Sequence, residues 1–208
     1  LIQPSQVVEG RTSVDGMIDK VFVQRGDTIR RGQPLVELVS DVERSSAESA
    51  RYRAQMEGQI ASARNRLEYA TRKLTRASDL AQQNFVSTQV RDEADTERRM
   101  ADSELQAVTE SRELAKIEHR RALDVLALRR VNSPFHGVVL DRLLNPGDIA
   151  EAGSGRKPVL KIAQVDPLRV DIVMPAALIG RVKVGMKARV TPMGLPGQHA
   201  AAVKMVDR

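Results

Sequence analysis

The sequence has no cysteine, no tryptophan and only five aromatic residues among its 208 residues. The absence of cysteine fits an exported protein without disulfides, although it excludes no compartment. Five aromatic residues are few for a large enzyme core and too few for a surface that stacks nucleobases. No apolar run approaches the roughly 18 residues of a membrane-spanning helix. Because the chain begins at Leu1, we expect any signal or membrane anchor to lie outside this fragment.

The net charge of +6 is not concentrated on one element of the chain. Residues 41–130 carry 17 Lys and Arg against 16 Asp and Glu, so the basic excess lies in the flanking regions. A nucleic-acid-binding protein usually gathers its basic charge on one helix or face. We therefore expect no nucleic-acid partner.

A further absence concerns the middle of the chain. Between Pro34 and Pro134, 99 residues contain no proline and one glycine, Gly58. Apolar positions recur there at alternating steps of four and three, at Met56, Ile60, Ala63, Leu67, Ala70, Leu74, Ala77 and Ala81. A weaker seam, with steps of three, four and seven, follows at Ala94, Ala101, Leu105, Val108, Ala115, Ala122 and Leu126. Such heptad seams pack two helices together. The pattern predicts an antiparallel helical hairpin over residues 41–128, with arms of roughly 60 Å at 1.5 Å per residue.

Local signals mark the start and the turn of this hairpin. Ser40 and Glu43 have the spacing of a capping box, which predicts the beginning of the first helix. Asn84 tolerates the left-handed conformation that ends a helix. Ser87 is a suitable N-cap for the returning helix. The turn is therefore expected at residues 83–87.

One motif occurs on both sides of the helical segment. An offset of 121 residues relates three glycines and one aspartate of the two copies, namely Gly16, Gly26, Asp27 and Gly32 to Gly137, Gly147, Asp148 and Gly153. Strand-forming residues surround both copies, and glycine suits turns with positive φ or close backbone approach. Because internal repeats fix architecture, we expect the two copies to form one β-sandwich.

Strand-like segments return after the second copy, at 159–163, 168–173 and 188–191. Turns are expected at Asp166-Pro167, at Gly185 and at 195–197, and one short helix at 176–180 after Pro175. This pattern predicts part of a small β-barrel. The expected domains are a first half-motif at 7–39, the helical hairpin at 40–130, a second half-motif at 131–163 and the partial barrel at 164–208.

The split repeat resembles the biotinyl/lipoyl-carrier fold, in which two quasi-symmetric halves form a sandwich. With the hairpin and the barrel segments 179–185 and 188–191, nearly the whole chain resembles the periplasmic adaptor family of tripartite efflux pumps and related exporters, also called membrane fusion proteins. The resemblance implies a mixed α and β fold. It comprises a split lipoyl-like β-sandwich, an inserted antiparallel coiled-coil hairpin and part of a small β-barrel.

The resemblance also implies a contact site at the hairpin turn. Family members that meet an outer-membrane channel carry Arg, three residues, Leu, six residues and Ser near this turn, and Arg76, Leu80 and Ser87 have that spacing. Each also has an ordinary interpretation, as a solvated arginine, a coiled-coil leucine and an N-cap serine. The family further implies a proton-driven or ATP-driven (ABC) inner-membrane transporter, an outer-membrane channel and a hexameric ring of copies. Its members are periplasmic and associated with the inner membrane.

No residue pattern indicates catalysis, a cofactor or a metal site. His119, His136 and His199 have no paired spacing with one another or with carboxylates. The seven methionines are scattered, as ordinary gap fillers are. We therefore expect a non-catalytic adaptor that links an inner-membrane transporter to an outer-membrane channel for efflux or secretion.

Two alternatives remain open. A biotinyl or lipoyl carrier subunit would bear a modified lysine at a tight turn between the two halves, where this chain has a helix beginning at Ser40. Lys20 lies too early, within a predicted strand, and an added mass on a lysine would identify such a carrier. A coiled-coil scaffold would dimerise through its heptads and would not need the split repeat.

Overall fold

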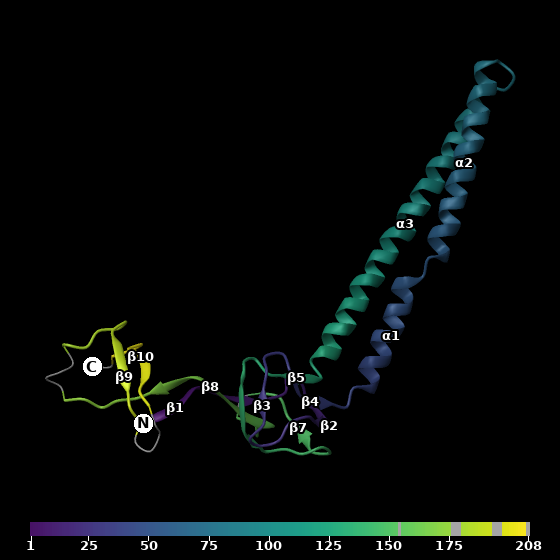
Figure 1. Ribbon diagram of the computed structural model, residues 1–208. Helices are drawn as coiled ribbons and strands as arrows, with labels where there is room; N and C mark the ends of the chain where they lie inside the picture. The colour runs from purple at the N-terminus through teal and green to yellow at the C-terminus, as the bar shows by residue number, and fades with distance from the viewer. Residues whose placement is uncertain (154, 176–179, 193–196, 207–208) are drawn as a thin grey trace. The chain divides into compact units, whose positions relative to one another are not determined.

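The computed structural model describes residues 1–153, 155–175, 180–192 and 197–206 (Figure 1). The chain divides into two compact units, Val7–Gln164 and Leu1–Gln6 with Val165–Arg208. Strands β1 (Ile2–Gly10) and β8 (Leu160–Val170) contribute residues to both units. Within the described ranges, no helix is long and apolar enough to cross a membrane.

The larger unit contains two four-stranded sheets, with strand orders β1-β8-β6-β3 and β5-β4-β2-β7. The remaining strands are β2 (Gly16–Val21), β3 (Thr28–Ile29), β4 (Pro34–Leu38), β5 (Arg130–Asn132), β6 (Gly137–Arg142) and β7 (Ile149–Ala150). Strands β1 to β4 precede the helices and β5 to β8 follow them. Strands β1 to β4 correspond in order to β5 to β8. Replacing each strand of the first sheet by its counterpart in the other half gives the strand order of the second sheet. Each sheet therefore takes two strands from each half.

Backbone hydrogen bonds repeat with the same 121-residue offset as the sequence motif. The N–H of Gly26 donates to the carbonyl of Val139 at 2.8 Å, and the N–H of Gly147 donates to the carbonyl of Ile18 at 2.8 Å. Both glycines have positive φ, 93° and 91°, which L side chains rarely adopt. The two halves thus cross-link reciprocally, which confirms the predicted split sandwich.

The two motif aspartates close equivalent turns. A carboxylate oxygen of Asp27 accepts a hydrogen bond from the N–H of Gln24 at 2.7 Å. Asp148 accepts the corresponding bond from Asn145 at 2.8 Å. Side-chain acceptors of this kind hold a turn in place of a backbone partner, which explains why the aspartates recur together with the glycines.

The core of this unit consists of aliphatic residues from both halves. Those with side chains almost fully removed from water are Ile18, Ile29, Leu35, Val36, Leu38, Val139, Val159, Leu160 and Ile162. The two sheets share this cluster. The halves therefore depend on each other for burial, although the whole hairpin separates them in sequence.

Three helices form the hairpin that Figure 1 shows extending between β4 and β5, namely α1 (Asp41–Gln55), α2 (Gly58–Gln82) and α3 (Thr88–Ala127). Both α1 and α2 pack on α3. The residues most buried along the seam are alanines, Ala47, Ala50, Ala54, Ala63, Ala70, Ala77, Ala94 and Ala101. Small side chains let the helix backbones approach closely. The antiparallel hairpin predicted from the heptads is confirmed.

The first arm differs from the sequence expectation because it breaks after α1. The buried residues of α1 are Ala47, Ala50 and Ala54, spaced by three and four residues. The same spacing would continue at positions 57 and 61. The seam of α2 instead runs through Ile60 and Ala63. A shift of one residue rotates a side chain by roughly 100° around a helix of 3.6 residues per turn. The break lets each segment keep its own seam against α3.

Arg112 of α3 lies against this break. Its Nε donates to the carbonyl of Ala54 at 3.3 Å, and its Nη2 donates to Oε1 of Glu57 at 2.7 Å. The last carbonyls of a helix have no intrahelical partner. Arg112 therefore supplies a donor that the interrupted helix lacks.

The predicted capping box does not form at the start of α1. Ser40 occupies the N-cap position, but its hydroxyl makes no capping hydrogen bond. Glu43 instead pairs with Arg129, which also donates to the carbonyl of Asp15 at 2.9 Å. Hydrogen bonds from its own backbone N–H and from Arg129 lower the pKa of Glu43. A charged partner from the end of the hairpin therefore outcompetes the orphan N–H of Ser40 for this carboxylate.

The smaller unit contains a two-stranded antiparallel sheet of β9 (Lys187–Val190) and β10 (His199–Ala202). Gly185 lies in a turn before β9, as expected. The turn expected at Asp166-Pro167 is wrong, because this pair lies within β8. The residue before proline favours an extended backbone, which suits a strand as well as a turn. The helix expected at 176–180 and the turn at 195–197 fall largely outside the described residues.

Candidate functional site

The hairpin turn begins where α2 ends at Gln82. Asn84 has φ of 59°, the left-handed conformation that the sequence predicts. The N–H of Asn84 donates to the carbonyl of Ala81 at 3.0 Å, and the N–H of Phe85 donates to the carbonyl of Leu80 at 2.9 Å. This pair of bonds is the Schellman arrangement, which satisfies carbonyls at a helix C-terminus. The backbone of the turn is thus fixed before any partner binds.

Ser87 lies at the N-cap of α3, on the other side of the turn. Its backbone is extended, with φ of −72° and ψ of 156°. Its carbonyl accepts a hydrogen bond from Val90 at 3.2 Å, but its hydroxyl makes no capping bond. Ser87 is therefore an N-cap by position, and its exposed hydroxyl is not committed to the helix.

Arg76 and Leu80 lie one turn apart near the end of α2. Arg76 is exposed, and the described part of the chain offers it no ion pair. Leu80 is 42% exposed, whereas its neighbour in the seam, Ala77, is 8% exposed. Leu80 is therefore not a buried residue of the coiled coil. The structure places Arg76, Leu80 and Ser87 at the same end of the hairpin, on both sides of one turn.

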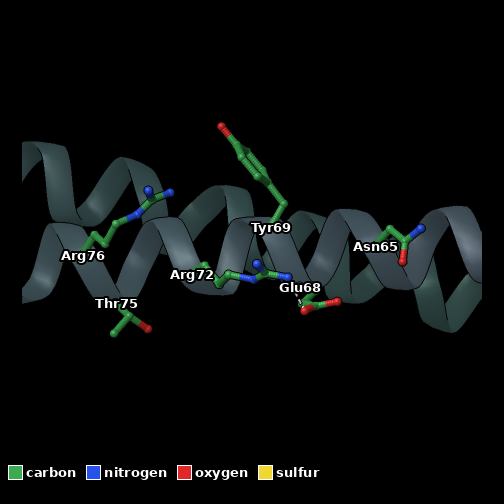
Figure 2. A pocket seen from close by; sticks show the side chains of 6 residues that line it. All are labelled: Asn65, Glu68, Tyr69, Arg72, Thr75 and Arg76. Atoms are coloured by element: carbon green, nitrogen blue, oxygen red, sulfur yellow. Dashed lines mark hydrogen bonds and ion pairs between the residues drawn. The ribbon is translucent and has the colours of Figure 1, made fainter.

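Arg76 also borders a groove on α2, shown in Figure 2. The residues that line it are Asn65, Glu68, Tyr69, Arg72, Thr75 and Arg76. The dashed line in Figure 2 joins Arg72 to Glu68, its ion-pair partner on the preceding turn. Arg72 is thus paired within the helix, so Arg76 is the arginine of this groove that remains available to a partner.

Ion pairs between the arms hold the helices beneath the turn. Arg66 lies 2.6 Å from Glu104, and Lys73 lies 2.5 Å from Glu97. The hydrogen bond and the charge of Glu97 raise the pKa of Lys73. All four groups are about half exposed, where such pairs contribute little to stability. Both pairs join α2 to α3 and so accompany the packing of the two helices.

Phe85 and Val90 belong to the same surface, and the sequence reasoning missed them. Phe85 is 73% exposed and Val90 is 43% exposed. The signal was present in the sequence, since residues 80–90 contain no charged side chain while the hairpin around them is densely charged.

The described residues offer no alternative site of a chemical kind. Within them, no group of three or more His, Asp or Glu side chains lies close enough together to hold a metal ion. The ionisable groups with shifted pKa values are partners in surface pairs, such as Glu9 with Arg11 and Asp171 with Arg169. The hairpin turn is therefore the candidate functional site.

No family model matches the chain. Over 197 residues it is 25% identical to the macrolide export protein MacA of Yersinia pestis, covering 94% of this chain and 53% of that protein. Over 199 residues it is 26% identical to the pyoverdine export membrane fusion protein PvdR of Pseudomonas aeruginosa, covering 95% of this chain and 51% of that protein. The chain thus spans about half the length of these curated relatives.

The fold is also that of a solved structure of a MacA protein. The crystal structure of MacA from Actinobacillus actinomycetemcomitans superimposes with a TM-score of 0.78. The two chains are 21% identical, and the match covers 99% of this chain and 64% of that one. The likeness includes the split sandwich and the inserted hairpin. These likenesses confirm the resemblance to periplasmic adaptors, or membrane fusion proteins, that the repeat first indicated.

Proposed function

We propose that this chain belongs to a non-catalytic periplasmic adaptor. In this function it links an inner-membrane transporter to an outer-membrane channel for efflux or secretion, and it is associated with the inner membrane. The observation that carries the proposal is the hairpin, which the split sandwich holds at its base and which ends in an exposed turn. A long arm with an accessible end suits spanning and docking, whereas chemistry needs an enclosed site.

We propose further that Arg76, Leu80 and Ser87 contact the channel. The guanidinium of Arg76 offers a planar fork of donors to carbonyl or carboxylate oxygens, which lysine reproduces poorly. Leu80 is exposed enough to enter an apolar notch. The hydroxyl of Ser87 is free of a capping role and can bind partner backbone.

A ring of six copies completes the proposal. Its support is an apolar stripe on α3 and its C-cap, defined as Leu114, Ile117, Val125 and the C-cap residue Leu128, which are 44–65% exposed. Spacings of three, eight and three place them on one face of a helix. The seam against α1 and α2 uses other residues of α3, so the stripe is available to a second copy.

The carrier alternative finds no support in the sandwich. Lys20 lies in β2, where it pairs with Glu37 of β4, and not at a turn. After β4 the chain enters α1 within a few residues, as the sequence indicates. No lysine turn of the carrier type joins the two halves.

The test is capture of the channel in living cells. The full-length protein, with a photoreactive residue replacing Gln83, is crosslinked in its host and its adducts are identified by mass spectrometry. We expect an outer-membrane channel protein, and we expect the double variant Arg76→Asp, Leu80→Ser to lose it. Exposed substitutions on a helix change stability by only about 0.5 kcal/mol, so the fold should persist.

Arg64→Asp is the matched control. Arg64 is exposed on the same helix, and the structure gives it no ion pair within the described ranges. Arg64 lies three turns from Arg76, so the Arg64→Asp variant should capture the channel as the unchanged protein does. Full capture by a stably folded double variant would exclude these residues as the contact.

A further inference from the structure

Phe85 is the most exposed of the five aromatic residues. Its exposed fraction is 73%, against 68% for Tyr52 and 60% for Tyr69. Burying a phenylalanine side chain is worth about 1.5–3 kcal/mol. The largest apolar side chain of the turn therefore stays exposed at the end of the arm, and the free energy that its burial would release is not gained within this chain.

The geometry of the turn does not require this exposure. In a Schellman arrangement the residue in the place of Phe85 commonly packs on the residue in the place of Leu80. Such packing explains why an apolar residue follows Asn84. It does not explain why Phe85 remains 73% exposed and Leu80 42% exposed. With Val90, 43% exposed, these side chains form an apolar group on both sides of the turn.

The surroundings of this group are polar but uncharged. None of the eleven residues from Leu80 to Val90 is ionisable, whereas residues 41–130 as a whole carry 33 charges. The polar side chains of the turn are amides and hydroxyls, namely Gln82, Gln83, Asn84, Ser87, Thr88 and Gln89. Apart from Arg76, which lies outside these eleven residues, the turn offers no counter-charge to a partner charge that would lose its water there. The surface therefore selects an uncharged partner.

We propose that Phe85 is the apolar anchor of the docking surface, and that the channel meets it with an uncharged rim of exposed backbone and an apolar notch. This inference rests on the proposed function. Phe85 enters the notch, Leu80 and Val90 border it, and the amides bind backbone groups. Arg76 then binds carbonyl oxygens, and carboxylates are absent from the contact.

An uncharged contact has a measurable signature. Salt weakens interactions between exposed charges, because the Debye length falls from roughly 10 Å at 0.1 M to roughly 3 Å at 1 M. Burial of an aromatic anchor is not weakened in this way. Binding of the channel should therefore depend on Phe85 and hardly on ionic strength.

The experiment uses the full-length protein with the photoreactive residue at Gln83 and compares Phe85→Ser, Phe85→Leu and Tyr52→Ser. Tyr52→Ser is the matched control, since it removes a similarly exposed aromatic side chain from α1, outside the turn and outside the groove that Arg76 borders. The captured channel is then purified, and its affinity for each variant is measured at about 0.05 M and about 0.5 M NaCl.

We expect Phe85→Ser to weaken binding by about tenfold or more, as loss of a buried anchor does. Phe85→Leu should fall between Phe85→Ser and the unchanged protein, and Tyr52→Ser should bind normally. The affinity of the unchanged protein should differ by less than about threefold between the two salt concentrations.

Three results would overturn the inference while leaving the proposed function intact. The first is normal binding by Phe85→Ser, and the second is a tenfold or greater loss of affinity at high salt. The third is full binding by Phe85→Leu together with a lower melting temperature of Phe85→Ser, which would assign Phe85 to the stability of the turn. Failure of the unchanged protein to capture any outer-membrane channel would instead refute both proposals.

Discussion

Single residues decide how closely neighbouring strands of one sheet approach. Gly137 begins β6, where a Cβ atom would lie 2.1 Å from the carbonyl oxygen of Ala163. The obstacle is backbone, so no side-chain rotation can relieve it. Gly58, at the start of α2, has open space around the same position. Close backbone approach therefore requires glycine at position 137, whereas the space around position 58 does not.

Gly137→Ala should therefore destabilise the protein, whereas Gly58→Ala should not. We expect the first to lower the free energy of unfolding by about 1–3 kcal/mol, as overpacking does. The second should leave it unchanged or raise it by up to about 1 kcal/mol, because alanine favours the helix. Urea unfolding of both variants measures the difference. Equal midpoints would show that β6 can move away from β8 at little cost.

The ion pair of Glu43 with Arg129 gives the base of the hairpin a dependence on pH. The folded pKa of Glu43 is lowered by hydrogen bonds from its own backbone N–H and from Arg129. The carboxylate therefore adds stability above its ordinary pKa of 4.5, and this addition is lost as the pH falls through the lowered folded value.

Glu43→Gln should thus be less stable than the unchanged protein at pH 7, and the gap should narrow as the pH falls below 4.5. Glu48→Gln is the control on the same helix, since the Glu48 carboxylate is 73% exposed. Thermal unfolding across the pH range measures both. A gap that is constant with pH would mean that the carboxylate of Glu43 makes no contribution through its charge.

At the scale of elements, the arms of the hairpin are unequal. The returning arm is one helix of 40 residues, and the outgoing arm is two helices of 15 and 25 residues. The break follows from the change of seam between Ala54 and Ile60. Arg112 binds both sides of it. The outgoing arm therefore has a defined joint, the break between α1 and α2. The joint arises because the positions of the buried alanines shift around the helix axis from α1 to α2.

Arg112→Met should weaken this joint. It leaves the carbonyl of Ala54 and the carboxylate of Glu57 without their donor, and a lost hydrogen bond of this kind costs about 1 kcal/mol. Arg120→Met on the same helix is the control, because Arg120 is exposed and unpaired within the described ranges. Thermal unfolding followed by circular dichroism, and amide hydrogen exchange at residues 54–58, test the difference in stability between the two variants. Equal protection in both variants would argue that the break is held by helix packing alone.

At the scale of the whole molecule, the apolar stripe of α3 tests the proposed ring. Leu114 and Ile117 are 63% and 65% exposed, which is costly unless another surface covers them. Leu123, on a different face of α3, is 45% exposed. Substitutions on the two faces therefore distinguish a specific contact between copies from nonspecific hydrophobic association.

The double variant Leu114→Glu, Ile117→Glu should therefore reduce self-association of the full-length protein, and Leu123→Glu should leave it unchanged. Buried glutamates would lose their hydration without a partner, which strongly disfavours the contact. Light scattering over a range of concentrations measures the mass of the assembly. An unaltered assembly in the double variant would place the contact between copies elsewhere.

The sequence by itself determined the repeat, the helical seams and the left-handed Asn84, because periodicity and glycine spacing express backbone geometry locally. The tertiary structure decided the features that depend on distant partners. Arg129 binds Glu43 and thereby replaces the capping box at Ser40, and Arg112 binds across the joint between α1 and α2. The uncharged segment around Phe85 can be seen in the sequence, but the exposed fraction of its side chain cannot, because no spacing rule states how much of a side chain its neighbours cover. Local rules predict which element forms, whereas competition between groups far apart in the chain sets which contacts each side chain makes.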